Sequence, residues 1–315
     1  MKKSPEARLR RNRRGANNMP KRSCLTVRSS AWCAMGVIAA IALSGCKFPS
    51  PPEVSVTIKS AGGEEEESAD TAEQTEVAGY GDLSGQVVFN GTPPTFPPLV
   101  SEGDGAVKDA SVCAAESVPD ETLEVNPQSK GIGNVVVYLA KTPRHIKPEL
   151  TEPAGETEVE PAIFDQKGCR FMPHILPIRV DLNQPVLVKS DDSIAHNTHT
   201  NPTRNSQFNQ AVKANDREGI PVKYTRPESQ PIPVTCDYHS WMKAYHFPVD
   251  HPYYAITDAD GKFTIKGLPA GKHQFIVWQE RAGILDRKLE VTIAPDETTT
   301  LDPSKTTYSP DKFNL

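Results

Sequence analysis

The chain has 315 residues and a formal net charge of -5, and its 29 prolines outnumber its 20 glycines. The acidic balance argues against a nucleic-acid-binding protein, which needs clustered basic side chains. The length allows two modest domains. The excess of proline fits short strands and loops better than helices.

Residues 1–46 have the pattern of an export signal. Nine Arg or Lys residues lie within the first 22 positions, and an uncharged apolar run follows at 31–43. This run is too short for a permanent transmembrane helix, which needs about 20 apolar residues. The pattern therefore predicts a secretory signal peptide.

The run ends in Leu43-Ser44-Gly45-Cys46, which resembles a bacterial lipobox. The resemblance implies lipidation of Cys46 and an exported protein that contacts the membrane through a lipid anchor on its periplasmic face. Lys47 favours the outer membrane. The alternative is a chance cysteine after an ordinary signal. Residues 47–79 are rich in Pro, Glu, Ser and Ala, which predicts a disordered tether; its acidic run at 64–67 is interpreted as solvated linker rather than as a metal-collecting segment.

From residue 80 the pattern becomes that of short strands. Leu83–Phe89 predicts a strand, and Asn90-Gly91 predicts a hairpin turn after it. The β-branched run at 134–139 predicts a buried strand, and 178–182 and 186–188 predict two more. Residues 200–221 are polar and predict a long loop, followed by a short strand at 222–225.

Cys236, His239 and Met242 place a thiol, an imidazole and a thioether within seven residues. Such a set suits a soft metal such as copper better than calcium or magnesium. Pro231 and Pro233 upstream exclude a helix, so the three side chains are expected on a tight loop after a strand. A further imidazole is available forty residues earlier, where His196-Asn197-Thr198-His199 follows an apolar strand.

These motifs resemble the cupredoxins, and the Cys236-x2-His239-x2-Met242 spacing is most similar to the short loop of amicyanin. Residues 81–293 also resemble bacterial lipoproteins of the methylamine-utilisation or plastocyanin-like type, through the segments 168–174, 196–199, 236–242 and 275–280. In those proteins proline is expected where Ser240 stands. The resemblance implies an all-β fold with a Greek-key sandwich. It also implies one type 1 copper ion held by His196, Cys236, His239 and, axially, Met242.

The same resemblance implies that Asn197 ties the two ligand loops together. His199 offers another possibility, because His196-x2-His199 with Cys236-x2-His239 has the donor types of a tetrahedral zinc site. His174 is a candidate for an additional metal ligand or a supporting residue, and a satisfied core histidine is the plainer interpretation.

The cysteines divide by position. Cys24, Cys33 and Cys46 belong to the signal segment, and Cys113, Cys169 and Cys236 follow it. We pair Cys113 with Cys169, which leaves Cys236 free for metal. A disulfide between Cys236 and either of the others, without metal, is the alternative.

A second unit is predicted at 252–300, after a first domain at 80–251. Short alternating strands with turns at Asp258-x-Asp260-Gly261 and Pro269-x-Gly271 resemble a transthyretin-like or carboxypeptidase-regulatory β-sandwich. The two aspartates are interpreted as turn residues, since an EF-hand loop needs Gly at its sixth position. Residues 301–315 are predicted to be a tail.

The functional interpretation is a lipid-anchored electron carrier that exchanges single electrons with a redox partner protein. Copper capture or delivery, and a structural or carbohydrate-binding surface protein with a relict metal site, are the alternatives. No catalytic triad, phosphate loop or acid–base carboxylate pair is recognisable, so an enzyme is not expected.

Overall fold

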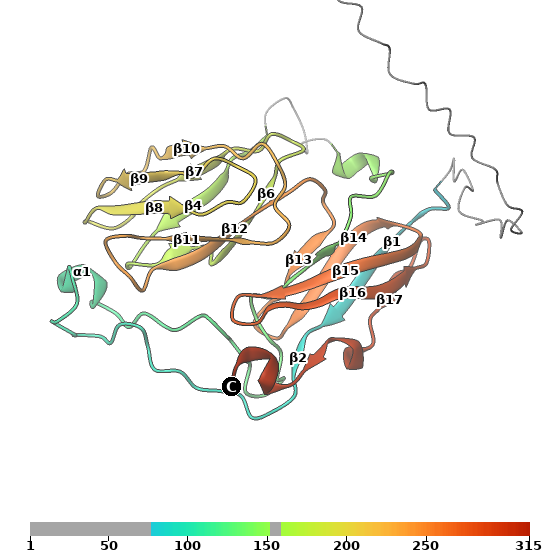
Figure 1. The fold of residues 1–315 in the computed structure, drawn as a ribbon, viewed down its shortest axis with the longest axis horizontal. Coiled ribbons are helices and arrows are strands. Elements are labelled where there is room, and N and C mark those ends of the chain that lie inside the picture. Colours follow the sequence, from blue (N-terminus) through green and yellow to red (C-terminus); the bar gives the residue numbers. More distant parts are fainter. Residues whose placement is uncertain (1–76, 152–158) are drawn as a thin grey trace, which may run out of the picture. The chain divides into compact units, whose positions relative to one another are not determined.

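The structure, a computed structural model, describes residues 77–151 and 159–315. The predicted signal peptide, the lipobox with Cys46 and nearly all of the predicted tether lie outside these residues. None of the helices in the described ranges is both long and apolar enough to cross a membrane. The described chain is built from short strands with very few helical turns, which confirms the all-β prediction (Figure 1).

The first sandwich consists of a four-stranded and a five-stranded sheet, with strand orders β10-β7-β4-β5 and β6-β12-β11-β8-β9. Its strands follow one another along the chain and lie together in Figure 1. They are β4 (Ala162–Gln166), β5 (Phe171–Met172), β6 (Ile175–Arg179), β7 (Val186–Val188), β8 (His196–Thr200), β9 (Asn209–Val212), β10 (Ile220–Val222), β11 (Ile232–Thr235) and β12 (Lys243–Val249).

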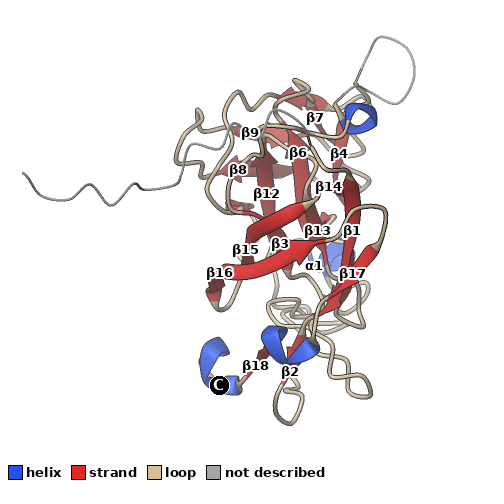
Figure 2. Cartoon of the chain, turned by 90° about the vertical axis from the view of Figure 1, so that its right-hand side faces the viewer, coloured by secondary structure: helices blue, strands red, loops and turns tan. Residues whose placement is uncertain are grey.

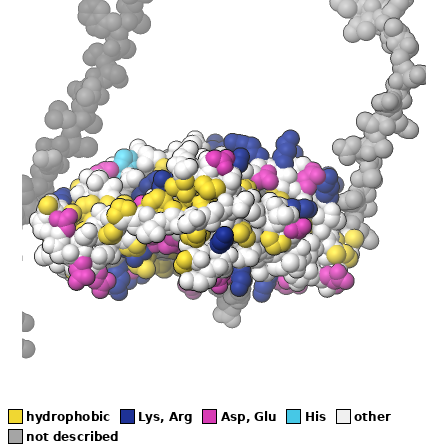
Figure 3. Space-filling view, turned by 90° about the horizontal axis from the view of Figure 1, so that it is seen from below, with side chains coloured by type: hydrophobic (Ala, Val, Ile, Leu, Met, Phe, Trp, Pro, Cys, Tyr) yellow, Lys and Arg dark blue, Asp and Glu magenta, His cyan; other side chains and the backbone are white. Residues whose placement is uncertain are grey.

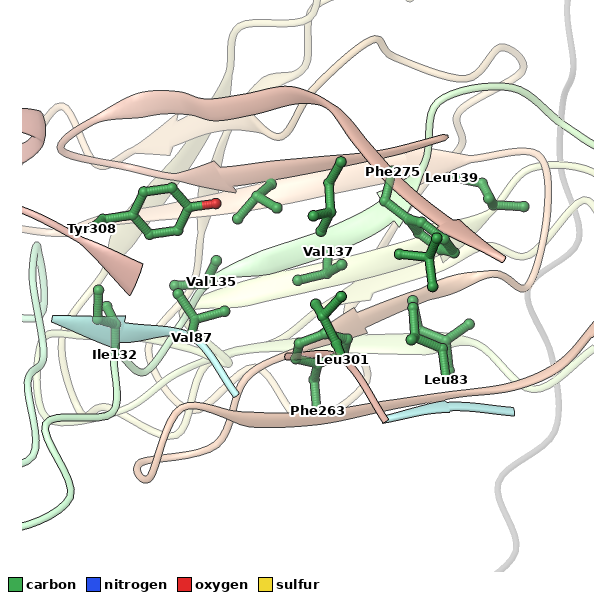
Figure 4. Packing of buried hydrophobic residues seen from close by; sticks show 14 of the residues in the cluster. Leu83, Val87, Ile132, Val135, Val137, Leu139, Phe263, Phe275, Leu301 and Tyr308 are labelled. Carbon is green, nitrogen blue, oxygen red and sulfur yellow. The ribbon is translucent and has the colours of Figure 1, made fainter. Parts of the chain in front are cut away.

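The second sandwich combines strands from both ends of the described chain. Its sheets have the orders β14-β1-β17 and β13-β3-β15-β16. The strands are β1 (Tyr80–Gln86), β3 (Val136–Leu139), β13 (Tyr254–Ile256), β14 (Lys262–Pro269), β15 (Gly271–Gln279), β16 (Gly283–Ile293) and β17 (Thr298–Thr300). Their inward side chains form an apolar core around Val137, Phe263 and Phe275 (Figure 4).

The strand pairing does not follow the predicted division at residue 252. Residues 80–86 pair with β14, and residues 136–139 pair with β13 and β15. The predicted hairpin at Asn90-Gly91 is wrong as well, since β1 lies between β14 and β17. The alternation of apolar residues correctly locates the strand β1. It does not predict which strands pair with β1, because that depends on packing between segments that are distant in the sequence.

Two segments predicted to lack structure contain strands. β9 pairs with β8, and β10 pairs with β7, within the stretch 200–221. Beyond residue 300, η2 (Pro303–Thr306), β18 (Thr307–Tyr308) and η3 (Pro310–Phe313) pack onto the second sandwich, where β18 pairs with β2 (Val88–Phe89). Phe313 is fully buried, so this tail completes the apolar core.

The two sandwiches share a third apolar cluster. Tyr138 and Trp278 of the second sandwich pack with Tyr245 and Phe247 on β12 of the first. The rings of Tyr245 and Trp278 meet edge to face at a centroid distance of 4.9 Å, a favourable aromatic arrangement. In Figure 2 β12 lies just above β15 and β3, next to which this cluster places it.

A long irregular segment, residues 99–118, lies over the end of the first sandwich; we call it the strap. Its ends approach each other through a bridge between Val100 and Val118, and it carries the short helix α1 (Ala110–Cys113). A disulfide joins Cys113 to Cys169. The short helix η1 (Pro148–Leu150) lies outside the strap, between β3 and β4 in the chain.

The turn before β14 uses its aspartates as the sequence predicts. Asp258 accepts hydrogen bonds from the backbone N–H groups of Asp260 and Lys262. Gly261 has φ 73°, and a Cβ there would lie 2.3 Å from the carbonyl oxygen of Val87. Turn geometry and close backbone approach therefore explain this motif without calcium.

Candidate metal centre

The ligand loop begins where β11 ends. Thr235 is the last residue of that strand, and the backbone N–H of Cys236 donates to the carbonyl of Met242 at 3.2 Å. The N–H of Met242 in turn donates to the carbonyl of His239 at 3.0 Å. These two bonds close the segment 236–242 into a tight loop, as predicted from the prolines that precede it at 231 and 233.

His196 reaches the same place from the neighbouring strand. It is the first residue of β8, and β8 pairs antiparallel with β11 through Thr235 and His199. The pairing sets the start of β8 against the residues that follow β11. One ligand atom from each of His196, Cys236 and His239 then lies within 4.8 Å of the others.

The two imidazoles face each other through their Nδ1 atoms, which are 3.0 Å apart. The Sγ atom of Cys236 lies 3.7 Å from Nδ1 of His239. Cys236 is free, so no disulfide competes for its sulfur. Both histidine side chains are completely buried, and Cys236 and Met242 are nearly so.

The outer nitrogen of each imidazole is held by a carboxylate. Nε2 of His196 lies 2.8 Å from Asp192, and Nε2 of His239 lies 3.0 Å from Asp109 on the strap. A carboxylate accepts hydrogen bonds, so each Nε2 carries a proton, and each ring in its neutral form presents a lone pair at Nδ1. A metal ion placed among these two nitrogens and the sulfur would therefore be within reach of all three.

Asp192 and Asp109 were not found from the sequence. Asp192 precedes His196 by four residues, and its carboxylate also accepts from the backbone N–H groups of Gly168 and Cys169. Carboxylates that orient metal-ligating histidines are common, so its closeness to His196 was a usable signal. Asp109 lies in an irregular loop 130 residues from His239, and no pattern marks it.

The electrostatics of the three side chains are strongly coupled. Burial by itself would raise the pKa of the Cys236 thiol, but His196 and nearby backbone N–H groups outweigh burial and hold the pKa below its ordinary value. Burial would likewise lower the pKa of His196, but Asp192 and Cys236 outweigh it and raise that pKa to about 9. The pKa of His239 is lowered, first by burial. The site therefore favours a thiolate at Cys236 beside a protonated His196 when no ion is bound, and a bound metal ion would replace that proton.

Asn197 links the two ligand segments directly. Its side-chain N–H donates to Asp237 at 2.9 Å, and its side-chain oxygen accepts the backbone N–H of Asp237 at 2.5 Å. Asp237 follows Cys236, so these bonds fix the loop against β8. The amide is in the position that the resemblance implied.

His199 and His174 do not join the three converging residues. His199 is partly exposed, and its ring nitrogens lie beside Asp237 and Gln207. The ring of His174 lies between Glu280 and Glu121. The four-residue zinc set with His199 is therefore not assembled.

A second convergence of donor atoms involves Cys169, Asp192 and His196. It cannot supply a thiolate, because Cys169 is joined to Cys113. Met242 belongs to the same buried cluster as Cys236 and lies across the loop from it. The residues available for an ion are thus two imidazoles, one thiolate and a neighbouring thioether.

No protein-family model and no curated protein sequence matches the chain. Among solved structures, similarity is found to a copper-containing nitrite reductase from Thermus scotoductus SA-01, with 19% identity, a TM-score of 0.28, and coverage of 33% of this chain and 27% of that one. An amicyanin from Paracoccus versutus shows 9% identity and a TM-score of 0.25 over 33% of this chain and 96% of its own.

A purple cupredoxin from Nitrosopumilus maritimus is also similar, with 18% identity and a TM-score of 0.22 over 28% of this chain and 99% of its own. The matched part therefore spans about a quarter of the nitrite reductase and nearly all of the two small proteins. At these identities and TM-scores the similarities do not assign a function to this chain.

Proposed function

We propose that the protein is a one-electron carrier with a single type 1 copper ion, held by His196, Cys236, His239 and, more weakly, Met242. The observation that supports it most is the approach of two Nδ1 atoms and one free sulfur to within 4.8 Å of one another in a buried place. Two imidazoles, a thiolate and a weak thioether form the donor set of electron-transfer copper.

The fourth donor favours copper over zinc. Structural zinc sites use Cys, His or carboxylate donors in a closed tetrahedron and have no use for a thioether. Met242 is buried beside Cys236, whereas His199, the residue that zinc would need, is engaged with Asp237.

Rigidity is the second support. The ligands are buried, and Asp192, Asp109 and Asn197 hold the side chains or their loops in place. When a bound copper ion changes its oxidation state, side chains fixed in this way move little, which keeps the barrier to electron exchange low. Residues that only hold ligands in position contribute much of a site's affinity.

The wider role belongs to the same proposal. The sequence of residues 1–46 supports an exported, lipid-anchored protein on the periplasmic face of a bacterial membrane. The electron partner would then be another exported protein. Nothing in the donor set calls for catalysis at the metal, since all three converging ligands are buried.

The test combines metal analysis with the visible spectrum of the copper(II)-loaded protein. We expect one copper per chain and intense blue colour from the thiolate ligand. Cys236→Ser should abolish the colour, and His199→Ala, the matched control, should leave both colour and stoichiometry unchanged. A colourless protein with one bound ion would refute electron-transfer copper, and more than one ion per chain with fast loss to a chelator would indicate copper delivery.

A further inference from the structure

The strap forms nearly all of its hydrogen bonds with itself. Among the described residues, every backbone hydrogen bond of the strap has its partner within 99–118, as in the 2.8 Å bond from Leu99 to Val118. The one hydrogen bond that leaves the strap joins Asp109 to His239. The strap is therefore a loop folded on itself, with a single polar contact to a ligand of the metal centre.

The other attachments of the strap are few. The disulfide between Cys113 and Cys169 ties the end of α1 to the turn between β4 and β5. The ammonium of Lys108 lies 4.9 Å from the ring centre of Tyr238 on the ligand loop. A small apolar cluster around the bridge at 100 and 118, the neck of the strap, includes Trp241. In the described chain no strand of a sheet pairs with the strap, so moving it breaks no strand pairing.

Two hollows flank the strap. One, of about 200 Å³, is lined by Leu99 and Val118 at the neck and by Trp241 of the ligand loop. The other, of about 500 Å³, is lined by Val112 and by the turn between β4 and β5, and it reaches Asp192. Protein interiors are close-packed, so space on both flanks means that the strap is loosely seated. It can move without displacing a packed core.

The donor atoms of the metal centre are closed off from solvent. The side chains of His196 and His239 are fully buried, and Cys236 is 3% exposed. On the sheet side, β8 and β11 are paired with each other and with further strands. On the other side, Asp109 covers the outer nitrogen of His239. Segments with few buried contacts open at the lowest free energy, so the strap opens before the sheet does.

We propose that the strap is a lid over the metal pocket, which moves about its neck to admit the ion and closes when Asp109 meets His239. The disulfide at Cys113, four residues after Asp109, keeps the open lid attached to the first sandwich. Closing returns the carboxylate to the imidazole, so one contact both shuts the pocket and fixes a ligand ring. The lid is a property of the chain and does not depend on which ion the pocket takes.

The test is alkylation of the Cys236 thiol by iodoacetamide in the purified full chain without metal, measured by mass spectrometry of the peptide that contains Cys236. A thiol under a closed lid reacts only while the lid is open, so the rate of alkylation reports the opening. Asp109→Gly removes the contact with His239, and glycine accepts the left-handed backbone at this position, where φ is 54°. We expect Cys236 to react at least tenfold faster in this variant.

Two further variants of the strap separate the contact from other effects. Asp104→Gly is the matched control, because the Asp104 carboxylate bonds only to the N–H of Ala106 within the strap, and its rate should stay within twofold of the wild type. Asp109→Asn removes the charge but keeps an acceptor for His239, so it should react nearly as slowly as the wild type. An Asp109→Gly rate less than ten times that of Asp104→Gly, or an Asp109→Asn rate equal to that of Asp109→Gly, would overturn the lid.

Ile178→Val tests whether alkylation needs unfolding of the whole first sandwich. Ile178 is fully buried on β6, where it pairs with Pro248 at a distance from the ligand loop. The variant loses one buried methylene and destabilises the sandwich without touching the strap. Its rate should equal that of the wild type. Acceleration as large as that of Asp109→Gly would assign the reaction to global unfolding and refute the lid.

Copper uptake gives a second readout. Asp109→Gly should take up copper(II) at least five times faster than Asp104→Gly, and equal rates would show that the ion enters by another path and would refute this role of the strap. Because alkylation is measured on metal-free protein, a colourless copper form would refute only the electron carrier. A blue protein whose Cys236 reacts equally fast in the two glycine variants would refute only the lid.

Discussion

The two sandwiches bury different kinds of side chain. The core of the second sandwich is built mainly from aliphatic and aromatic residues such as Phe275, Val137 and Ile265, and its buried polar side chains in the described chain include Gln279 and Thr306 but no ligand-forming histidine. The interior of the first also contains fully buried polar groups, among them Gln166, His196, His239 and His246. Burying a polar group is unfavourable unless it is hydrogen-bonded. We infer that the second sandwich contributes mainly to the free energy of folding, whereas the first also holds the buried imidazoles of the candidate site.

This contrast extends to the surface. Figure 3 shows a face on which acidic and basic side chains are interspersed with hydrophobic ones. Opposite charges in water contribute little to stability. Asp192 is buried and holds His196 away from water, whereas Asp109 is 36% exposed and approaches the buried ring of His239 from the surface. The charge of Asp192 is therefore the one that acts with least screening by solvent.

The largest expected effect comes from removing a core ring of the second sandwich. Phe275→Ala should lower the free energy of unfolding by about 3–5 kcal/mol, the usual cost of truncating a buried phenylalanine, because Phe275 is fully buried. Urea titration measures this loss. Ile163→Ala, at an exposed position, should change stability little, and copper binding by folded Phe275→Ala should equal that of the wild type. Loss of copper binding would show that the two sandwiches are not independent in function.

A smaller effect is expected from cutting the link between the ligand loops. Asn197→Ala removes both bonds to Asp237, and copper affinity should fall about 10- to 100-fold, as is usual for residues that orient ligands. Chelator competition measures the affinity. Asn126→Ala removes a comparable bond to Asp260 in the second sandwich and should leave copper affinity unchanged. Equal affinities in both variants would contradict the role of Asn197.

The smallest effect concerns acid stability. Complete burial lowers the pKa of His246 from 6.5 to about 3, and Tyr224 is its hydrogen-bond neighbour at 2.8 Å. Below pH 6.5 the imidazole of His246 becomes protonated in the unfolded chain but stays neutral in the folded chain. The free energy of unfolding is therefore highest above pH 6.5 and falls as the pH drops toward 3. The loss should be about 1 kcal/mol per pH unit.

Urea titrations between pH 7 and pH 5 on the wild type and His246→Phe measure this contribution. The variant lacks the titrating group, so its stability should fall less steeply over the same range. Parallel profiles for the two proteins would show that His246 does not carry the dependence.

The sequence predicted the local features of the metal centre better than its surroundings. Cys236, His239 and Met242 are close in sequence, so their spacing alone indicated a shared site, and β11 was expected before them. Asp109 could not be predicted, because it approaches His239 only through the path of the strap. The partners of β1 were missed for the same reason, since its pairing with β14 joins residues far apart in the chain.

The tail illustrates a different limit. Residues 301–315 carry too few apolar residues to show a period, yet Leu301 and Phe313 are buried in the second sandwich. Single large side chains can fill gaps that neighbouring strands leave open. Such contributions depend on shape, which a linear pattern does not contain.

The pairing of β1 with β14 and β17 has a consequence for biosynthesis. Chains leave the ribosome from the N-terminus, so β1 emerges long before either partner. Strands β4–β12 are consecutive in the chain and lie between β3 and β13 of the second sandwich. They can therefore pair with one another before β13–β17 have been synthesised. The pocket formed by His196, Cys236 and His239 can thus assemble before β1 has met either of its partner strands.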